Sequence, residues 1–423
     1  MKQKDVVVGM DVGTSHVRVV VGEHRSDGTI NIIGVGLSPS EGLKKGFVVD
    51  IDKTIESINK AVDEAERMAG VKIESAFVSL VGLDVQLQQN RGVVAVTSED
   101  REIRPQDVHR AIEATRVIAI PAEREIVDII AHEFIVDGYD GIKDPVGMLG
   151  VRLEVEAMLV TAPSTCLQNL IRCVRKSGID VSGVVLKSFA NGEVCLNRDE
   201  KELGVFIIDI GGGTTEIGYY KNGILQDISV IPVGGFHITN DLAYGLHTSF
   251  YAAENLKIEF GYAMQSMADD NHEIEVVTVG GKDKQKVTER ELASYMVPRV
   301  QEILQLARNE MFQLGGSEAL AANVVITGGV ALMDGMVEVS ENILGTSVRV
   351  GEPKLVGVQS PIFTTSVGII YYVIANHLSE GNVSERKESR KRNKPRKKGG
   401  SGGSKESPGF WKKIADWFNE FFE

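Results

Sequence analysis

Cysteine, tryptophan and long apolar runs are all scarce in this sequence. Its 423 residues include three cysteines, Cys166, Cys173 and Cys195, an odd number without metal-ligand spacing, which argues against a disulfide framework. No run approaches the roughly 18 consecutive apolar residues that a membrane-spanning helix needs. The polar residues 1–5 lead straight into a strand-like stretch, so we expect no signal peptide. The simplest expectation is a reduced, cytoplasmic protein with two large domains.

Positive charge is also scarce, except near the C-terminal end. The net charge is −13, but residues 384–423 hold twelve Lys/Arg against six Asp/Glu, a balance of +6. The first 383 residues therefore carry −19. Because phosphate contacts need a basic surface, this acidic body argues against nucleic acid as a partner.

The sequence does contain an internal repeat. Residues 6–15 read VVVGMDVGTS and residues 205–215 read VFIIDIGGGTT, and each run is followed by a second strand-like run. A hairpin turn comes next, of the Asp-Gly type at 27–28 and of the Asn-Gly type at 222–223, and then a third strand. Two similar units this far apart indicate two related half-molecules.

Helices are predicted between the strands, which over residues 1–380 gives an α/β fold. Their start and stop signals are Gly70 at the end of a helix from residue 51, Ser164 and Gly178 around a second, Ser249 and Gly261 around a third, and Thr288 at the start of a fourth.

Each repeat contains an Asp-apolar-Gly turn suited to phosphate. Backbone N–H groups and small hydroxyls in such a turn form an anion cradle, and glycine permits close approach. One turn alone is often only a Gly-rich hairpin, but two facing turns would clamp a triphosphate. The strand-end aspartates, Asp11 and Asp209, suit a hydrated Mg²⁺. The predicted turn residues are Asp11, Gly13, Thr14 and Ser15 in the first repeat and Asp209, Gly211, Gly212, Gly213, Thr214 and Thr215 in the second.

A third glycine-rich element, Gly328-Gly329, follows the strand-like run 324–327 and would let a flat base lie close to the backbone. The three motifs together resemble the two phosphate motifs and the adenosine motif of the actin, Hsp70 and sugar-kinase superfamily, which implies ATP and Mg²⁺ as cofactors. A Glu-x-x-Lys pair lies over the ribose and adenine in that superfamily, although most such pairs are solvated surface charges. The resemblance adds Gly235, Glu254, Lys257, Gly328, Gly329 and Val330 to the nucleotide-binding residues.

Within the superfamily, the sequence closely resembles the FtsA family of bacterial cell-division proteins. The stretches that carry this are VIPVGG at 230–235, ITNDLA at 238–243, GLHTS at 245–249 and AENLK at 253–257. The resemblance implies an actin-like (ribonuclease H-like) fold of two related halves. The expected parts are a first half at 1–83, 164–197 and 356–380, an inserted small subdomain at 84–163, a second half at 198–230 and 305–355, and an outer subdomain of the second half at 231–304.

One position departs from the superfamily. Filament-forming relatives carry an acidic or amide residue, often in a Glu-Pro-x-Ala pattern, that orients the attacking water, whereas the nearest match here begins with Lys187. A protonated ammonium cannot act as a base and orients water poorly compared with a carboxylate. We therefore expect ATP binding with slow or absent hydrolysis, and no catalytic residue is assigned.

The C-terminal end of the chain reads as a basic, disordered linker at 381–407 and an amphipathic helix at 408–423. At about 100° per residue, the apolar side chains of this helix fill one arc and the polar side chains the other. Such a helix could pack in the core, dock in a partner's groove or lie in a lipid interface, and the adjacent positive run favours an anionic membrane. The residues expected to enter the membrane are Phe410, Trp411, Ile414, Trp417, Phe418, Phe421 and Phe422.

The FtsA resemblance implies work at the cytoplasmic face of the bacterial membrane, at the division site. There the protein would tether filaments of the tubulin-like protein FtsZ and self-assemble into actin-like filaments at the septum, with other division proteins as partners. The FtsZ C-terminal tail would bind the outer subdomain, although any one basic residue there is more often a solvated charge. The residues expected to contact it are Lys284, Lys286, Arg290 and Arg299.

Three alternatives share the fold. A small-molecule kinase such as a sugar kinase would need a carboxylate base in the cleft, and nothing in the sequence marks one. A chaperone-type ATPase of the Hsp70 kind would need a β-rich substrate domain where the linker begins. A pilus-assembly homologue shares much of the fold, but the terminal helix argues against it.

Overall fold

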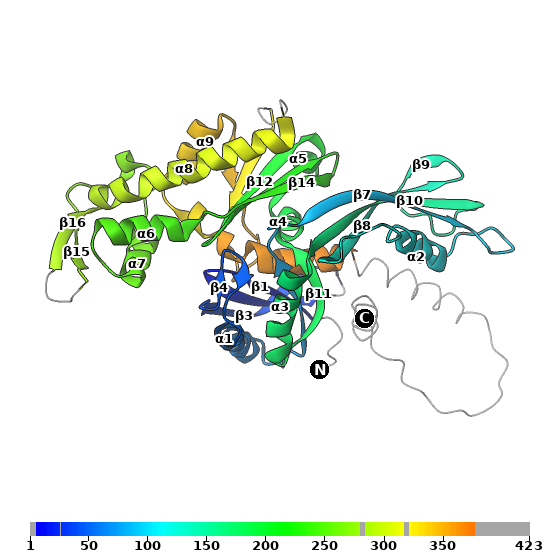
Figure 1. Cartoon of the computed structure of the whole chain (residues 1–423), viewed down its shortest axis with the longest axis horizontal. Helices are drawn as coiled ribbons and strands as arrows, with labels where there is room; N and C mark the ends of the chain where they lie inside the picture. Colours follow the sequence, from blue (N-terminus) through cyan, green and yellow to red (C-terminus); the bar gives the residue numbers. More distant parts are fainter. Residues whose placement is uncertain (1–5, 26, 280–283, 317–320, 377–423) are drawn as a thin grey trace.

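A computed structural model of the protein describes residues 6–25, 27–279, 284–316 and 321–376 (Figure 1). The predicted linker at 381–407, the predicted terminal helix at 408–423 and all seven predicted membrane residues lie outside the described residues.

Two five-stranded sheets make up the centre of the molecule. The first contains β1 (Val6–Val12), β2 (His16–His24), β3 (Ile30–Pro39), β6 (Ser75–Leu80) and β11 (Asp180–Leu186), and the second contains β12 (Val205–Ile210), β13 (Thr215–Lys221), β14 (Ile224–Ile231), β17 (Asn323–Thr327) and β18 (Val348–Val350). Their orders are β11-β6-β1-β2-β3 and β18-β17-β12-β13-β14. In each sheet, three consecutive strands form an antiparallel meander and two later strands add in parallel. The two halves thus share one plan, as the repeat predicts.

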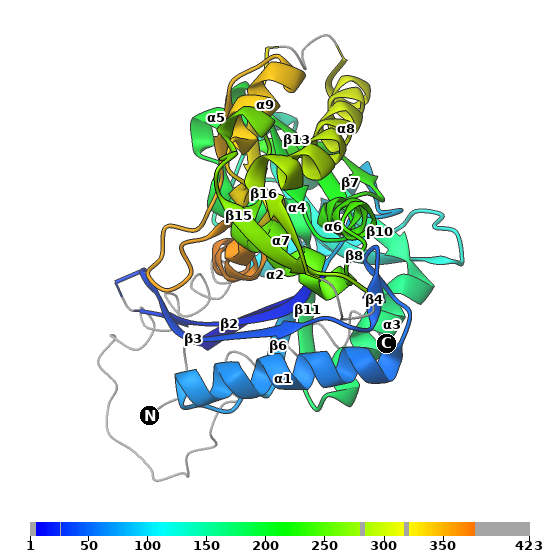
Figure 2. The same ribbon diagram turned by 90° about the vertical axis from the view of Figure 1, so that its left-hand side faces the viewer.

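Helices cover and connect the sheets. They are α1 (Ile51–Ala69), α3 (Ser164–Lys176), α4 (Lys187–Cys195), α5 (Arg198–Leu203), α8 (Glu289–Gly315), α9 (Met336–Leu344) and a helix at 364–376. In Figure 2, α1 lies along the first sheet. Its buried residues, among them Ile58, Ala61 and Ala65, recur at helical spacing, and they belong to the apolar core of the first half.

The predicted helix signals are mostly confirmed. Gly70 ends α1 in a left-handed conformation (φ 68°), and Thr288 Oγ1 accepts a hydrogen bond from the Glu291 N–H at the start of α8. Ser249 caps its helix in the same way. The predicted cap at Ser164 is wrong, because that serine is already the first helical residue. The chain passes from the preceding strand into α3 through Pro163, which has no hydroxyl to offer.

Smaller units extend from both halves. One consists of β7 (Gln86–Ala95), α2 (Pro105–Ala114), β8 (Arg124–Val136), β9 (Tyr139–Ile142) and β10 (Arg152–Pro163), with the sheet order β7-β10-β8-β9 and an apolar core of its own. The other consists of α6 (Gly235–Gly245), α7 (Phe250–Phe260), β15 (Glu273–Val277) and β16 (Lys284–Thr288). The two units lie at opposite ends of the molecule (Figure 1). A short hairpin, β4 (Leu43–Lys44) and β5 (Phe47–Val48), and 3-10 turns at Gln265–Met267, Gly329–Leu332 and Pro361–Phe363 complete the description.

The helix at 364–376 packs tightly against the first sheet and α4. A methyl group built on Gly9 of β1 would lie 2.1 Å from the Ser366 carbonyl oxygen, and one built on Gly368 would lie 2.1 Å from the Ala190 carbonyl oxygen. Glycine at these two positions therefore permits the close approach. Among the described residues, none of the helices combines the length and the apolar character that crossing a bilayer requires.

Candidate functional site

The two predicted phosphate turns face each other between the sheets. The first turn joins β1 to β2 and the second joins β12 to β13. In each turn a glycine N–H donates to the carbonyl oxygen three residues later, at 3.1 Å from Gly13 and 3.0 Å from Gly211. A methyl group built on Gly213 would lie 2.8 Å from Thr14 Cγ2, so the turns are in direct contact. Only glycine fits at that point of the second turn.

A pocket between the turns gathers most of the predicted phosphate and base residues. Those that line it are Asp11, Gly13, Thr14, Ser15, Asp209, Gly211, Gly212, Gly213, Thr214, Gly328 and Gly329. The structure adds Arg18, Val81, Lys187, Pro361, Ile362 and Thr365 to the lining. Thr215 does not line the pocket, because it is buried and its hydroxyl donates to the Val233 carbonyl oxygen at 2.9 Å. Its side chain therefore braces the second turn.

The remaining predicted residues form a cluster beside the second turn. The Gly235 N–H donates to the Gly211 carbonyl oxygen at 2.8 Å. A methyl group built on Gly235 would lie 2.9 Å from Val330 Cγ2 and 3.4 Å from Lys257 Nζ. Gly235, Val330 and Lys257 are therefore neighbours, although they come from α6, the 3-10 turn after β17, and α7.

Lys257 and Glu254 are not a solvated surface pair. Lys257 Nζ donates to Glu254 Oε2 at 2.7 Å, to Thr239 Oγ1 at 2.8 Å and to the Gly235 carbonyl oxygen at 3.2 Å. Burial lowers the pKa of the Lys257 ammonium, against the opposing pull of the Glu254 carboxylate. All three donor positions of this lysine are thus used inside the protein, which fixes the shape of the cluster.

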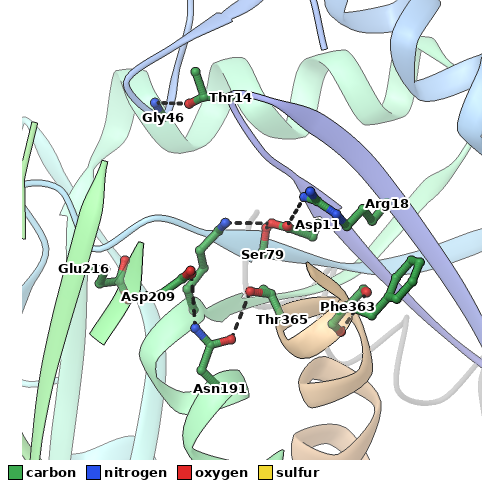
Figure 3. Close-up of polar contacts among 12 residues, drawn as sticks. Asp11, Thr14, Arg18, Gly46, Ser79, Asn191, Asp209, Glu216, Phe363 and Thr365 are labelled. Atoms are coloured by element: carbon green, nitrogen blue, oxygen red, sulfur yellow. Dashed lines mark hydrogen bonds and ion pairs between the residues drawn. The ribbon is translucent and has the colours of Figure 1, made fainter. Parts of the chain in front are cut away.

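Asp11, at the end of β1, is the most strongly held anion of the pocket. Its Oδ1 accepts from Ser79 Oγ at 2.7 Å and lies 2.9 Å from Lys187 Nζ, and its Oδ2 lies 3.4 Å from Arg18 Nη1. Figure 3 shows Arg18 and Ser79 converging on this carboxylate from two strands of the first sheet. Burial alone would raise the pKa of Asp11, but the charges of Lys187 and Arg18 outweigh it and lower the pKa.

Asp209, at the end of β12, has a different environment. Its Oδ2 accepts from Asn191 Nδ2 at 3.3 Å, and Asn191 Oδ1 in turn accepts from Thr365 Oγ1 at 2.9 Å. This chain runs from the second turn through α4 to the helix at 364–376 (Figure 3). Burial raises the pKa of Asp209, and Lys187 only partly offsets that effect. The two predicted magnesium ligands therefore differ, since Asp11 holds its charge more readily than Asp209.

A third carboxylate, Glu216 of β13, is buried behind the turns. Its Oε2 accepts the Gly82 N–H at 2.8 Å, and its Oε1 accepts the hydroxyl of Ser188. Burial raises the pKa of this carboxyl group, against the two hydrogen bonds. Because Gly82 precedes β7, whereas Ser188 lies in the first turn of α4, Glu216 joins three parts of the chain at one point.

Five residues of the site, Arg18, Ser79, Asn191, Thr365 and Glu216, were not predicted from the sequence. Arg18 could have been found, because β1 and β2 form a tight hairpin whose register places Arg18 opposite Asp11. Ser79 and Thr365 come from distant strand and helix ends, and their sequence neighbourhoods carry no local signal. Lys187 was noticed only as a departure from a pattern, and the structure places its ammonium in the pocket itself.

The four basic residues predicted to contact a partner are all engaged within the chain. Lys284 and Lys286 lie on β16 and pair with Glu275 at 2.7 Å and with Glu273 at 2.8 Å. On α8, Arg290 pairs with Asp270 at 2.9 Å, and Arg299 pairs with Asp241 at 2.6 Å and with Glu302. Exposed pairs of this kind exchange readily with other anions, because they contribute little to stability.

The chain is similar to known proteins over most of its length. The family model described as cell division protein FtsA matches residues 206–368, and the model of the SHS2 domain inserted in FtsA matches residues 82–161. The cell division protein FtsA of Bacillus subtilis (strain 168) is 45% identical over 381 residues, which is 90% of this chain and 86% of that protein. The chain belongs to the FtsA family. Its place is therefore among the cell-division proteins.

Other FtsA proteins are similar over nearly their whole length. That of Pseudomonas aeruginosa (PAO1) is 39% identical over 87% of this chain and 89% of its own. That of Escherichia coli (strain K12) is 34% identical over 90% and 94%. Residues 82–161, which match the inserted domain of FtsA, include all of β7, β8, β9 and α2.

Solved structures resemble this FtsA family member in fold. The PilM-PilN type IV pilus biogenesis complex has a chain with a TM-score of 0.59 at 17% identity, covering 87% of this chain and 98% of that one. MreB5 of Spiroplasma citri bound to ADP gives 0.52 at 13% identity, covering 90% and 98%. These similarities confirm the predicted actin-like fold. At 13–17% identity they show the fold alone and not the activity.

Proposed function

We propose that this FtsA family member binds ATP between its two phosphate turns and acts in cell division as an ATP-bound scaffold. The observation that carries the proposal is the contact between the turns, where Gly213 meets Thr14 and a pocket opens beside them. Backbone N–H groups and hydroxyls from two separate halves converge there, which is the arrangement that a chain of phosphates requires. The bound forms of MreB5, with ADP and with AMPPNP, support nucleotide as the ligand of this fold.

The base and ribose would lie over the cluster beside the second turn. Gly328 and Gly329 line the pocket, and Gly328 adopts φ 89°, a backbone conformation that favours glycine. Glu254 and Lys257 stand at the adjacent wall with Gly235 and Val330. A flat ring could lie close to this glycine backbone, with Pro361 and Ile362 as further lining of the same pocket.

Asp11 and Asp209 suit a magnesium ion that keeps most of its water. Among the described residues, no group of three or more His, Cys, Asp and Glu side chains is placed to hold a metal. The two aspartates would hold Mg²⁺ through its water molecules, and the ion would neutralise phosphate charge. With Lys187 beside Asp11, hydrolysis is proposed to be slow or absent, since a raised lysine pKa leaves no base at that place.

We extend the proposal to membrane attachment and FtsZ binding. We assign membrane attachment to the apolar residues of 408–423, including Trp417 and Phe418, and FtsZ-tail binding and filament assembly to the folded body at the division site. The tail contacts would be the basic residues of β16 and α8, of which Lys284 and Lys286 are the most readily released from their exposed pairs. The division of the chain into the subdomains given above belongs to this proposal.

Nucleotide binding is tested by calorimetric titration of the full-length protein with ATP and Mg²⁺. Gly213→Val places a branched side chain against Thr14 and should abolish measurable binding while the protein stays folded by circular dichroism. Glu56→Ala, which changes an exposed residue of α1, serves as the control and should bind as the wild type does. If Gly213→Val binds ATP with unchanged affinity, the ligand does not lie between the turns.

Tethering is tested by flotation of FtsZ with anionic liposomes. The wild-type chain should carry FtsZ to the top of the gradient, and Trp417→Glu should leave both proteins at the bottom, because the change puts a charge on the apolar arc. Asn419→Glu adds the same charge to the polar arc and is the matched control. If the wild-type chain floats without FtsZ, the membrane assignment stands and the partner assignment fails.

A further inference from the structure

Lys187 brings a positively charged side chain to the phosphate pocket. It is the first residue of α4, and its Nζ lies 2.9 Å from Asp11 Oδ1. The side chain keeps 13% of its surface exposed, and the surface that it lines is the pocket between the turns. A ligand in that pocket therefore lies against the Lys187 side chain.

Lys187 forms an ion pair with Asp11 at the pocket. Lysine ordinarily carries its charge at neutral pH, and its Nζ lies 2.9 Å from Asp11 Oδ1, as expected of an ammonium beside a carboxylate. Arg18 is the second cation, and it faces Asp11 from the neighbouring strand, with its Nη1 3.4 Å from Asp11 Oδ2. Asp11 thus has two cationic neighbours.

We propose that the Lys187 ammonium binds the terminal phosphate of a nucleoside triphosphate and makes the pocket prefer ATP to ADP. In doing so it neutralises part of the phosphate charge that a divalent metal ion would otherwise neutralise. This rests on the proposed function, since it concerns the same pocket. Lys187 lines the pocket together with Thr14 and Gly213, the residues at which the two turns meet. Phosphate oxygens held by both turns would lie next to a charged donor there.

The strength of such a contact follows from its surroundings. A charge-assisted N–H···O bond to phosphate is roughly twice as strong as a neutral one, and attraction between charges grows where water is excluded. Lysine meets phosphate as a compact point charge with rotatable donors, so it can release Asp11 and turn toward an incoming anion. Asp11 would keep Arg18 and Ser79 as partners during that exchange.

The experiment measures affinities of the full-length protein for ATP and ADP, each in Mg²⁺ and in EDTA, by calorimetry. In EDTA the wild type should bind ATP at least about tenfold more tightly than ADP, because only ATP has a terminal phosphate that reaches the Lys187 ammonium. Lys187→Met, which removes the charge and keeps an unbranched side chain one atom shorter, should weaken ATP binding in EDTA about tenfold or more and change ADP binding less than about threefold. Lys187→Arg keeps a cation and should retain most of the preference for ATP.

Magnesium supplies a second readout. The loss of ATP affinity in Lys187→Met should be smaller in Mg²⁺ than in EDTA, because the metal neutralises the same oxygens. If the loss of ATP affinity is as large in Mg²⁺ as in EDTA, Lys187 does not neutralise the phosphate charge that the metal neutralises. If Lys187→Met weakens ATP and ADP equally, the lysine is only the structural partner of Asp11.

Folding of the variant does not limit the test. Should Lys187→Met lose its far-ultraviolet circular dichroism, the wild-type comparison in EDTA decides, and equal affinities for ATP and ADP overturn the proposal. If the wild type binds neither nucleotide under either condition, the proposed function fails first and the role of Lys187 fails with it.

Discussion

Replacing Glu216 should show how the inserted unit is attached to the second half. Glu216 of β13 accepts the backbone N–H of Gly82 at 2.8 Å and the hydroxyl of Ser188, and both Glu216 and Ser188 are buried. Gly82 is also the first residue of the segment that matches the inserted FtsA domain. This carboxylate therefore holds the beginning of the insert, α4 and the second sheet together.

The expected magnitudes follow from counting donors. Glu216→Leu keeps similar bulk but leaves two buried donors without an acceptor, each costing about 1–3 kcal/mol, so a loss of about 2–6 kcal/mol is expected. In Glu216→Gln, the amide oxygen can accept from Gly82 while the amide nitrogen donates to the Ser188 hydroxyl, so the loss should be about 1 kcal/mol or less. Adding Ser188→Ala to Glu216→Leu removes one orphaned donor and should recover about 1 kcal/mol.

The pH dependence gives an independent check. Burial raises the folded-state pKa of Glu216 above its ordinary value of 4.5, so the folded state binds more protons than the unfolded state above that pH. The stability that this group contributes is complete below pH 4.5 and is lost as the pH rises toward the raised pKa. Glu216→Gln cannot titrate, so its stability relative to the wild type should improve as the pH rises above 4.5.

The assay combines thermal denaturation with amide hydrogen exchange. Exchange at Gly82 should become fast in Glu216→Leu and stay slow in Glu216→Gln, because only the first loses the acceptor. Glu99→Gln, at an exposed position, is the control and should change neither readout. Equal melting temperatures for the Leu and Gln variants, with unchanged exchange at Gly82, would refute the reasoning.

Three further predictions concern other parts of the molecule. Burial and the charge of Arg18 lower the pKa of His16 to about 4, so wild-type stability should rise with pH between about 4 and 6.5. His16→Gln cannot titrate in this range. After discounting for solvent screening, it should remove about 1 kcal/mol of the rise between pH 5 and 7, as measured by denaturant titration. Gly9→Ala places a methyl group against the Ser366 carbonyl oxygen, so it should lower the free energy of unfolding by about 1–3 kcal/mol in thermal denaturation. It should also weaken ATP binding by shifting the 364–376 helix. An unchanged melting temperature would contradict the close approach. Arg299→Met breaks the two hydrogen bonds to Asp241 that join α8 to α6 and should lower the melting temperature more than Lys284→Met does; the opposite order would show that the Arg299 pair is not structural.

Much of the fold could be predicted because its signals are local. The two Asp-apolar-Gly turns sit between strands that are adjacent in the chain, so their hairpins close with little ambiguity. The helix ends at Gly70 and Thr288 depend on single residues whose chemistry is visible in the sequence. The cap at Ser164 failed because the chain enters α3 directly from a strand, leaving the serine already inside the helix.

The rest of the site could not be predicted, because it depends on contacts between distant segments. Ser79 reaches Asp11 only after β6 has paired with β1, and Thr365 reaches Asn191 only after the 364–376 helix has packed on α4. Glu216 follows the second turn by a few residues, yet its role depends on Gly82. The environment of Lys187 likewise exists only when both halves are assembled.

The contact between the two turns bears on how long a nucleotide would stay bound. Thr14 meets Gly213 and Ser15 meets Gly212, so each half of the molecule closes one side of the same small space. For a nucleotide bound there as proposed, this contact would block exit between the turns. Its release would then require the two halves to separate, and its dwell time would report how often they do. A change far from the pocket that stiffens or loosens the two halves should then alter how long a nucleotide stays, even where its affinity barely moves.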